Sequence, residues 1–186
     1  MTPAVRTARC RLIRACLALA LPLWLWGCTG VPDGLAPVDD FQLERYLGTW
    51  YEIARLDHSF ERGLSRVTAT YEQRDDGTIG VLNRGFNAGT GEWEEAAGKA
   101  RFAGAEDIAS LEVSFFGPFY GGYHVIVLDR DDYAYALVSG PSRDYLWILA
   151  RRPELSQVVL DALVAKASRL GFPTRDLIFV EHGPAG

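Results

Sequence analysis

The sequence predicts an all-β fold: an eight-stranded up-and-down antiparallel barrel with one C-terminal helix packed outside it and a short final strand. Three observations support this fold. Eight short strand-like stretches follow one another at even spacing, each ends in turn-forming residues, and a single helical pattern comes only after the eighth. Eight antiparallel strands that bury one face form a sandwich or a closed barrel, and short sequential hairpins favour the barrel.

The strands are recognised by their two-residue alternation and by the turns between them. In the second one, Val67, Ala69 and Tyr71 share one face while Thr68 and Thr70 share the other. One face of the sheet is therefore expected to be apolar and the other hydrated. The strands are predicted at residues 49–56, 66–73, 78–86, 93–102, 109–116, 121–128, 133–139 and 145–151.

A helical period appears only after the eighth strand. Pro153 stands at its start, Gly171 follows its last turn and Pro173 lies beyond, an order typical of a helix and its ends. A last strand is expected at 176–182. The apolar residues near a 3.6-residue spacing are Leu155, Val159, Leu163 and Leu170.

Residues 1–27 are predicted to be a lipoprotein signal peptide. Residues 1–14 carry four arginines and no acidic residue, and the apolar run that follows is too short to span a bilayer. The run ends in Leu-Trp-Gly-Cys at 25–28, which resembles the bacterial lipobox and implies that Cys28 carries a lipid. In the lipoproteins that this segment resembles, an Asp directly after the Cys keeps the protein at the inner membrane. Thr29 stands at that position here, which favours the outer membrane. The alternative is an ordinary signal peptide that contains a Cys by chance.

Processing would leave an acidic chain without a free thiol. Cys10 and Cys16 depart with the signal and Cys28 is acylated, so a protein exported without disulfides has to rely on its core. The signal takes four of the 19 Lys and Arg and none of the 24 Asp and Glu, which leaves a net charge of −9 over 159 residues. This charge argues against nucleic acid as a partner, and the length suits one domain.

The segment between Cys28 and the first strand is rich in Gly, Pro and Asp. Residues 28–40 are predicted to be a lipid-anchored tether, which if flexible would reach roughly 20 Å. Residues 41–186 are predicted to be the folded domain. That domain is therefore expected to lie close to its membrane.

Three short motifs occur in order along the predicted barrel. Gly48-Thr49-Trp50-Tyr51 lies on the first strand, Asp132-Tyr133 precedes the seventh, and Arg151 ends the eighth. They resemble the signature regions of the lipocalins, and the longer runs around them resemble the bacterial outer-membrane lipoprotein lipocalins, relatives of apolipoprotein D. The resemblance implies that Trp50 closes the narrow end and that Arg151 packs across its ring, a contact worth roughly 0.5–2 kcal/mol. Gly48, Trp50 and Arg151 are thus expected to form the barrel floor rather than to contact a ligand.

Odd and even connections of an up-and-down barrel lie at opposite ends, so the turns can be sorted from the sequence. The even turns are short and acidic and share the end with Trp50, which makes the odd ones the mouth of the barrel. The alternative for the aromatic loop of the mouth is self-packing around Gly117 and Pro118. The mouth residues suited to an acyl chain and an anionic head group are Phe60, Arg62, Phe116, Phe119, Tyr120 and Arg143.

At this strand number the interior either is packed solid or holds one small ligand. If it holds a ligand, small residues leave volume and aromatic residues supply wall area. Glu52 shares the parity of Trp50 and is expected to point inward, but Arg55 has the opposite parity, so Glu52 has no predicted partner. The predicted ligand-binding residues are Ala54, Val67, Ala69, Tyr71, Val113, Phe115 and Trp147.

No catalytic residues, metal site or cofactor are predicted. His58, His124 and His182 do not form a spaced metal set, Ser65 lacks the glycines of a nucleophile elbow, and adjacent Asp-His-Ser residues diverge along an extended chain. The resemblance implies instead a membrane-anchored protein that binds and stores or transports fatty acids or lysophospholipids in the cell envelope. Its expected partners are one such lipid and the membrane, with a homodimer to be tested. A filled-barrel structural lipoprotein and a lipid-modifying enzyme are the alternatives.

Overall fold

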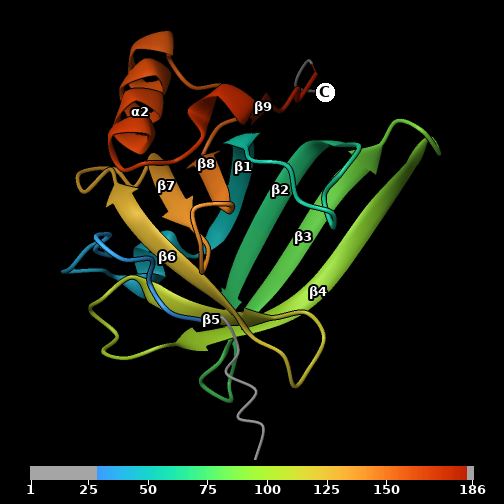
Figure 1. Cartoon of the computed structure of the whole chain (residues 1–186). Helices are drawn as coiled ribbons and strands as arrows, with labels where there is room; N and C mark the ends of the chain where they lie inside the picture. Colours follow the sequence, from blue (N-terminus) through green and yellow to red (C-terminus); the bar gives the residue numbers. More distant parts are fainter. Residues whose placement is uncertain (1–28, 184–186) are drawn as a thin grey trace, which may run out of the picture.

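Eight antiparallel strands close into a barrel in the computed structural model, which describes residues 29–183 (Figure 1). Each strand pairs with the next along the chain, and pairing of β1 with β2 and with β8 closes the cylinder, which confirms the predicted up-and-down barrel. The strands are β1 (Gly48–Arg55), β2 (Leu64–Gln73), β3 (Ile79–Asn87), β4 (Glu92–Phe102), β5 (Ser110–Ser114), β6 (Gly121–Leu128), β7 (Tyr135–Ser139) and β8 (Leu146–Ala150).

The strand bounds lie close to those predicted, with two differences of note. The β5 strand ends at Ser114, so Phe115 and Phe116 belong to the following loop and not to the strand. The β7 strand begins at Tyr135 because Tyr133 has a φ of 53° and the Ala134 amide donates to the Asp129 carboxylate, which holds this stretch in a turn.

Apolar side chains form two clusters on the two faces of the sheet. One fills the closed end inside the barrel and includes Tyr46, Trp50 and Leu111. The other lies outside, between the sheet and helix α2 (Gln157–Arg169), which Figure 1 shows beside β7 and β8. Alternation along β8 serves both clusters, since Leu149 belongs to the inner one and Ile148 to the outer one.

Helix α2 begins later than predicted. Its N-cap is Ser156, whose hydroxyl accepts a hydrogen bond from the Val159 amide, so Pro153 lies before the helix and not in it. The helix ends close to the predicted position: α2 stops after Arg169, and the chain turns at Gly171, which has a φ of 85°. Leu163 is buried in the outer cluster, as its spacing indicates.

Two short elements were not predicted, and one predicted strand is much shorter. Helix α1 (Leu43–Tyr46) covers the closed end of the barrel, and the 3₁₀ turn η1 (Thr174–Asp176) follows α2. The final strand, β9 (Ile178–Phe179), covers two residues rather than 176–182, because it pairs only with Ala54 and Arg55 of β1.

A bulge interrupts β1 where it pairs with β8. Glu52 pairs with Leu149, but Ala54 pairs with Ile148, so two residues of β1 advance for one of β8. Because side chains alternate with a period of two, one extra residue reverses the facing of everything that follows in the strand. Arg55 therefore points to the same side of the sheet as Glu52.

The segment predicted to be a tether packs along the barrel over much of its described length. The Val38 amide donates to the Val125 carbonyl, and the Val38 carbonyl accepts from the Ala109 amide. Arg130 forms an ion pair with Asp39 near the end of the segment. The signal peptide and Cys28 lie outside the described residues, and the domain boundaries stay predictions. No helix within residues 29–183 is long and apolar enough to cross a membrane.

Candidate functional site

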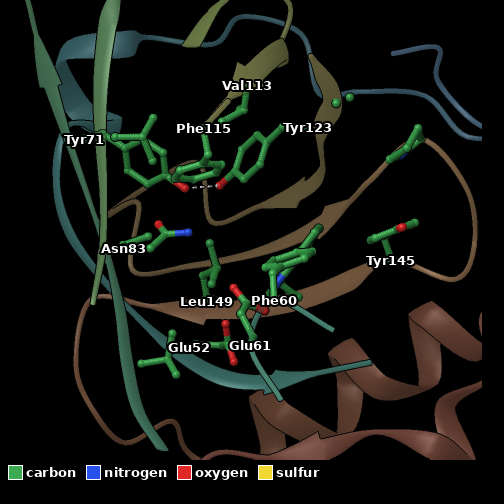
Figure 2. A pocket seen from close by; sticks show the side chains of 17 residues that line it. Glu52, Phe60, Glu61, Tyr71, Asn83, Val113, Phe115, Tyr123, Tyr145 and Leu149 are labelled. Carbon is green, nitrogen blue, oxygen red and sulfur yellow. Dashed lines mark hydrogen bonds between the residues drawn. The ribbon is translucent and has the colours of Figure 1, made fainter. Parts of the chain in front are cut away.

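A cavity of about 300 Å³ occupies the barrel between the closed end and the mouth (Figure 2). Its wall is mostly apolar and is built from side chains of several strands and of the β1–β2 and β7–β8 loops. The interior is therefore not packed solid. Six residues predicted to contact a ligand line it: Val67, Ala69, Tyr71, Val113, Phe115 and Trp147.

Ala54 is the exception among the predicted pocket residues. It is fully buried in the outer cluster, against Ile148 and the final strand, and does not line the cavity. The prediction extended the regular alternation of β1 past Glu52, and the bulge reverses that alternation. The position predicted for Ala54 is taken by Arg55, whose side chain points inward.

The bulge supplies the partner that Glu52 lacked in the sequence prediction. Arg55 Nη1 donates to Glu52 Oε1 at 2.6 Å, and Arg55 Nη2 donates to the carbonyls of Glu61 and Leu64 at 2.8 and 3.2 Å. The Glu61 carboxylate accepts a hydrogen bond from Trp147 Nε1 at 3.1 Å. Two buried carboxyl groups thus lie beside one buried guanidinium, and both carboxyls line the cavity.

The charge of this acidic cluster, defined as Glu52, Arg55 and Glu61, follows from its burial. Burial, with a smaller contribution from the charge of Glu61, raises the pKa of Glu52 to about 8, and Arg55 opposes the shift. Burial also raises the pKa of Glu61, against the opposing hydrogen bond from Trp147. One guanidinium balances one carboxylate, so we expect the cluster to retain one proton at neutral pH.

The β1–β2 loop folds over the cavity and is held by aromatic contacts. The His58 ring stacks on Phe60 and Tyr145, with centroid distances of 5.3 and 4.9 Å, and lies 4.7 Å from Trp147. Burial and the nearby Arg55 charge lower the pKa of His58 to about 4, so the imidazole is neutral at physiological pH. The loop thereby places Phe60 and Glu61 on the cavity wall.

Three tyrosine hydroxyls meet deep inside the barrel. Tyr71 donates to the Tyr123 oxygen at 2.9 Å, and the Tyr46 and Tyr123 oxygens are 2.7 Å apart. Burial raises the pKa of all three phenols, so they remain protonated donors and acceptors. Tyr71 and Tyr123 also line the cavity, at a distance from the acidic cluster in Figure 2.

The residues predicted for the floor meet at the closed end. The Arg151 guanidinium lies 4.0 Å from the centroid of the Trp50 ring, and Arg151 donates to the carbonyls of Thr49 and Arg45. Trp50 is completely buried, and its indole donates to the Tyr46 carbonyl at 2.8 Å. Gly48 has a φ of 90°, and a Cβ there would lie 3.5 Å from the Arg151 side chain.

The aromatic mouth residues surround a second hollow of about 470 Å³, which we call the vestibule. Phe60, Phe116, Phe119 and Tyr120 line it, and Phe60 and Phe115 line both the vestibule and the cavity. Phe116 is 82% exposed, so the aromatic loop does not pack on itself.

The two predicted mouth arginines do not line either space. Arg62 forms an exposed ion pair with Asp57 at 2.6 Å. Arg143 donates to the Leu170 carbonyl at the C-terminus of α2 and to the Asp33 carbonyl, so it fastens helix and N-terminal segment to the barrel. Their expected role at an anionic head group is therefore not supported. Arg84, which no sequence pattern singled out, lines the vestibule instead.

Within residues 29–183, no group of three or more His, Cys, Asp and Glu side chains could hold a metal ion.

The sequence did not predict Arg55, Glu61 and Tyr123 as cavity residues or as partners of cavity residues. Alternation along β6 could have found Tyr123, but Glu61 lies in a loop and Arg55 follows a bulge, so neither gives a periodic signal.

Comparison with known proteins gives one consistent result. The family model of the lipocalin-like domain matches residues 41–182. The outer membrane lipoprotein Blc of Vibrio cholerae is 52% identical over 170 residues, covering 91% of this chain and 99% of that protein. Blc of Escherichia coli K12 is 57% identical, with 81% and 85% covered, and apolipoprotein D of Rattus norvegicus is 33% identical, with 63% and 64% covered.

Among solved structures, insecticyanin from the tobacco hornworm Manduca sexta superposes with a TM-score of 0.64. It is 23% identical, and the match covers 84% of this chain and 88% of that one. At this identity the similarity supports the fold alone.

Proposed function

The chain belongs to the lipocalin family, whose members bind small hydrophobic ligands, and from that premise we propose that it binds amphiphilic lipids, either fatty acids or lysophospholipids. We further propose that it stores or transports them in the cell envelope. The observation that carries the proposal is the mostly apolar cavity, whose polar lining side chains are few: the carboxyls of the acidic cluster, tyrosine hydroxyls and the Asn83 amide. The volume of about 300 Å³ lies at the lower end of ligand pockets.

The distribution of charge indicates how such a lipid would lie. Among the described residues that line the cavity, none is Lys or Arg, whereas Glu52 and Glu61 are both present. A carboxylate or phosphate buried there would meet acidic side chains without a free cation, which is costly. We therefore place the acyl chain in the cavity and the head group on the mouth side, in or beyond the vestibule, where water can hydrate its charge.

The proposed location is the outer membrane, through a lipid on Cys28. Support comes from the Leu-Trp-Gly-Cys run at 25–28 and from the relatives that carry the name outer membrane lipoprotein. A lipid anchor would keep the cavity next to a source of amphiphiles. No resident cofactor is part of the proposal.

Native mass spectrometry of the delipidated protein, incubated separately with palmitate and with a lysophospholipid, tests the proposed function. A one-to-one adduct with either lipid is the expected result. A protein that binds neither would favour a structural role, and lipid products of altered mass would favour an enzyme. Ala69→Phe, which places a large side chain on the cavity wall, should lose the adduct, and Thr68→Phe on the outer face is its matched control.

A further inference from the structure

We propose that three exposed phenylalanines at the mouth form a membrane-docking surface, which turns the vestibule toward the bilayer that holds the lipid anchor. This docking surface consists of Phe60, Phe116 and Phe119. The occupant we assign to it is the hydrocarbon boundary of a phospholipid bilayer. The inference rests on the proposed lipidation of Cys28 and deepens the proposed function by naming how the lipid reaches the cavity.

The docking surface is unusually apolar for its exposure. Phe60, Phe116 and Phe119 are 58%, 82% and 68% exposed, and all three line the vestibule. Exposed apolar side chains that gather in one place, unlike single ones, are typical of an interaction surface. Phenylalanine side chains gathered at one end of a domain suit the boundary between head groups and acyl chains.

The vestibule behind these rings opens through the side of the barrel. Strand β4 pairs with β5 only over Lys99–Phe102, so within the described chain the stretch 92–98 lacks that partner (Figure 1). The vestibule lies between this part of β4 and the loop after β5, and Ala96 and Phe119 line it from the two sides. It shares Val67, Asn83 and Phe115 with the cavity, so the two spaces are neighbours along one path.

The position of the anchor places the docking surface at the membrane. The carbonyl oxygen of Thr29 lies 2.7 Å from the point that a Cβ on Gly122 would occupy, so Thr29 packs directly on the backbone of β6. Gly122 is only three residues beyond Phe119, and Thr29 directly follows Cys28. Figure 1 shows the blue start of the described chain beside β5. A lipid on Cys28 would therefore enter the bilayer close to the aromatic loop.

The charges around the docking surface favour apolar over electrostatic docking. Arg62 pairs with Asp57, Arg84 with Glu95 at 3.2 Å, and Arg101, which lies over the Tyr120 ring, with Glu112, so none of these three arginines is a free cation. The processed chain carries a net charge of −9, which opposes attraction to anionic lipids. Docking is therefore expected to depend on the rings and to change little with the fraction of anionic lipid.

Fluorescent labels on introduced cysteines test the proposal in the lipidated protein. Phe116→Cys and Phe119→Cys are each labelled with an environment-sensitive dye, since every native cysteine is in the predicted signal or is acylated. The proteins are reconstituted in phosphatidylethanolamine–phosphatidylglycerol vesicles that contain doxyl-labelled lipid. Val158→Cys, an apolar position on α2 that is 80% exposed, is the matched control.

The expected result is quenching by doxyl lipid and protection from aqueous iodide at positions 116 and 119, and the reverse at 158. Phe60→Ser introduced with either label should lower the ratio of docked to undocked protein by about tenfold, because one ring is no longer buried. Labels at 116 and 119 that iodide quenches and doxyl lipid does not would overturn the proposal. Protection from both quenchers would also overturn it, since a second copy or another protein would then cover the rings.

This test can fail independently of the proposed function. If the protein forms the one-to-one lipid adduct but neither label meets the bilayer, only the docking surface is wrong. If doxyl lipid quenches both labels but no lipid adduct forms, docking stands and lipid binding is wrong.

Discussion

Arg55 Nη1 donates to Glu52 Oε1 at 2.6 Å inside the barrel wall, and the two side chains meet because the β1 bulge turns Arg55 to the inner side, where Glu52 already points. This buried pair explains how a carboxyl group can line an apolar pocket. It also makes the cavity wall sensitive to substitution and to pH.

Replacing Arg55 with Met should lower the free energy of unfolding by about 3–5 kcal/mol, because two buried carboxyl groups then lack their cation and the carbonyls of Glu61 and Leu64 lack their donor. Guanidinium denaturation at neutral pH measures the change. Arg62→Ala, which breaks only an exposed ion pair, is the control and should leave the unfolding midpoint unchanged. Equal effects of the two variants would contradict the structural role of Arg55.

The parent protein should lose stability relative to Glu52→Gln as pH rises. The pKa of Glu52 is raised to about 8, so its neutral form contributes stability that is fully present below the pKa of the unfolded chain and is lost as pH rises toward 8. Glutamine stays neutral and loses nothing in this window. Urea titrations of both proteins between pH 4.5 and 8.5 measure the difference, and a constant value across that range would count against a raised pKa.

Trp50→Ala should destabilise the protein by about 3–5 kcal/mol while leaving ligand preference unchanged, since a completely buried ring is lost at the closed end. Arg151→Ala should have a smaller effect in the same direction, because it removes the cation over that ring and two hydrogen bonds to carbonyls. Thermal melts and competitive lipid titrations of each variant check this. Lost binding with unchanged melting would assign these residues to the ligand site instead.

Ala69→Phe should abolish lipid binding with little change in the melting temperature of the ligand-free protein, because the ring fills existing cavity volume. A packed interior would respond with a loss of about 1–3 kcal/mol from overpacking. Thr68→Phe, one residue away on the outer face, is the matched control and should bind as the parent does. Titration with a fluorescent fatty acid distinguishes the pair.

Cys28→Ser should release the protein from membranes, because the proposed lipid is the covalent anchor. Fractionation of cells followed by a salt wash of the membranes measures the release. A variant that still sediments with washed membranes would show that another contact holds the protein there, and the docking surface would then be the first region to test.

The alternation and turn chemistry of the sequence determined the barrel, the outer position of α2 and six of the predicted cavity residues. Such features are predictable because a regular strand repeats every two residues, so neighbours in the chain settle which side chains share a face. The lipocalin resemblance, and not residue spacing, predicted that Trp50 and Arg151 pack together at the floor of the barrel.

Only the tertiary structure decided where that regularity fails. The β1 bulge depends on hydrogen bonding to β8, more than ninety residues later in the chain, and it moved Ala54 outward and Arg55 inward. Arg143 likewise turned to the end of α2, and Thr29 came to lie on Gly122. Contacts between distant segments set these positions, and their energies arise only when the barrel has closed, so no local pattern of residues records them.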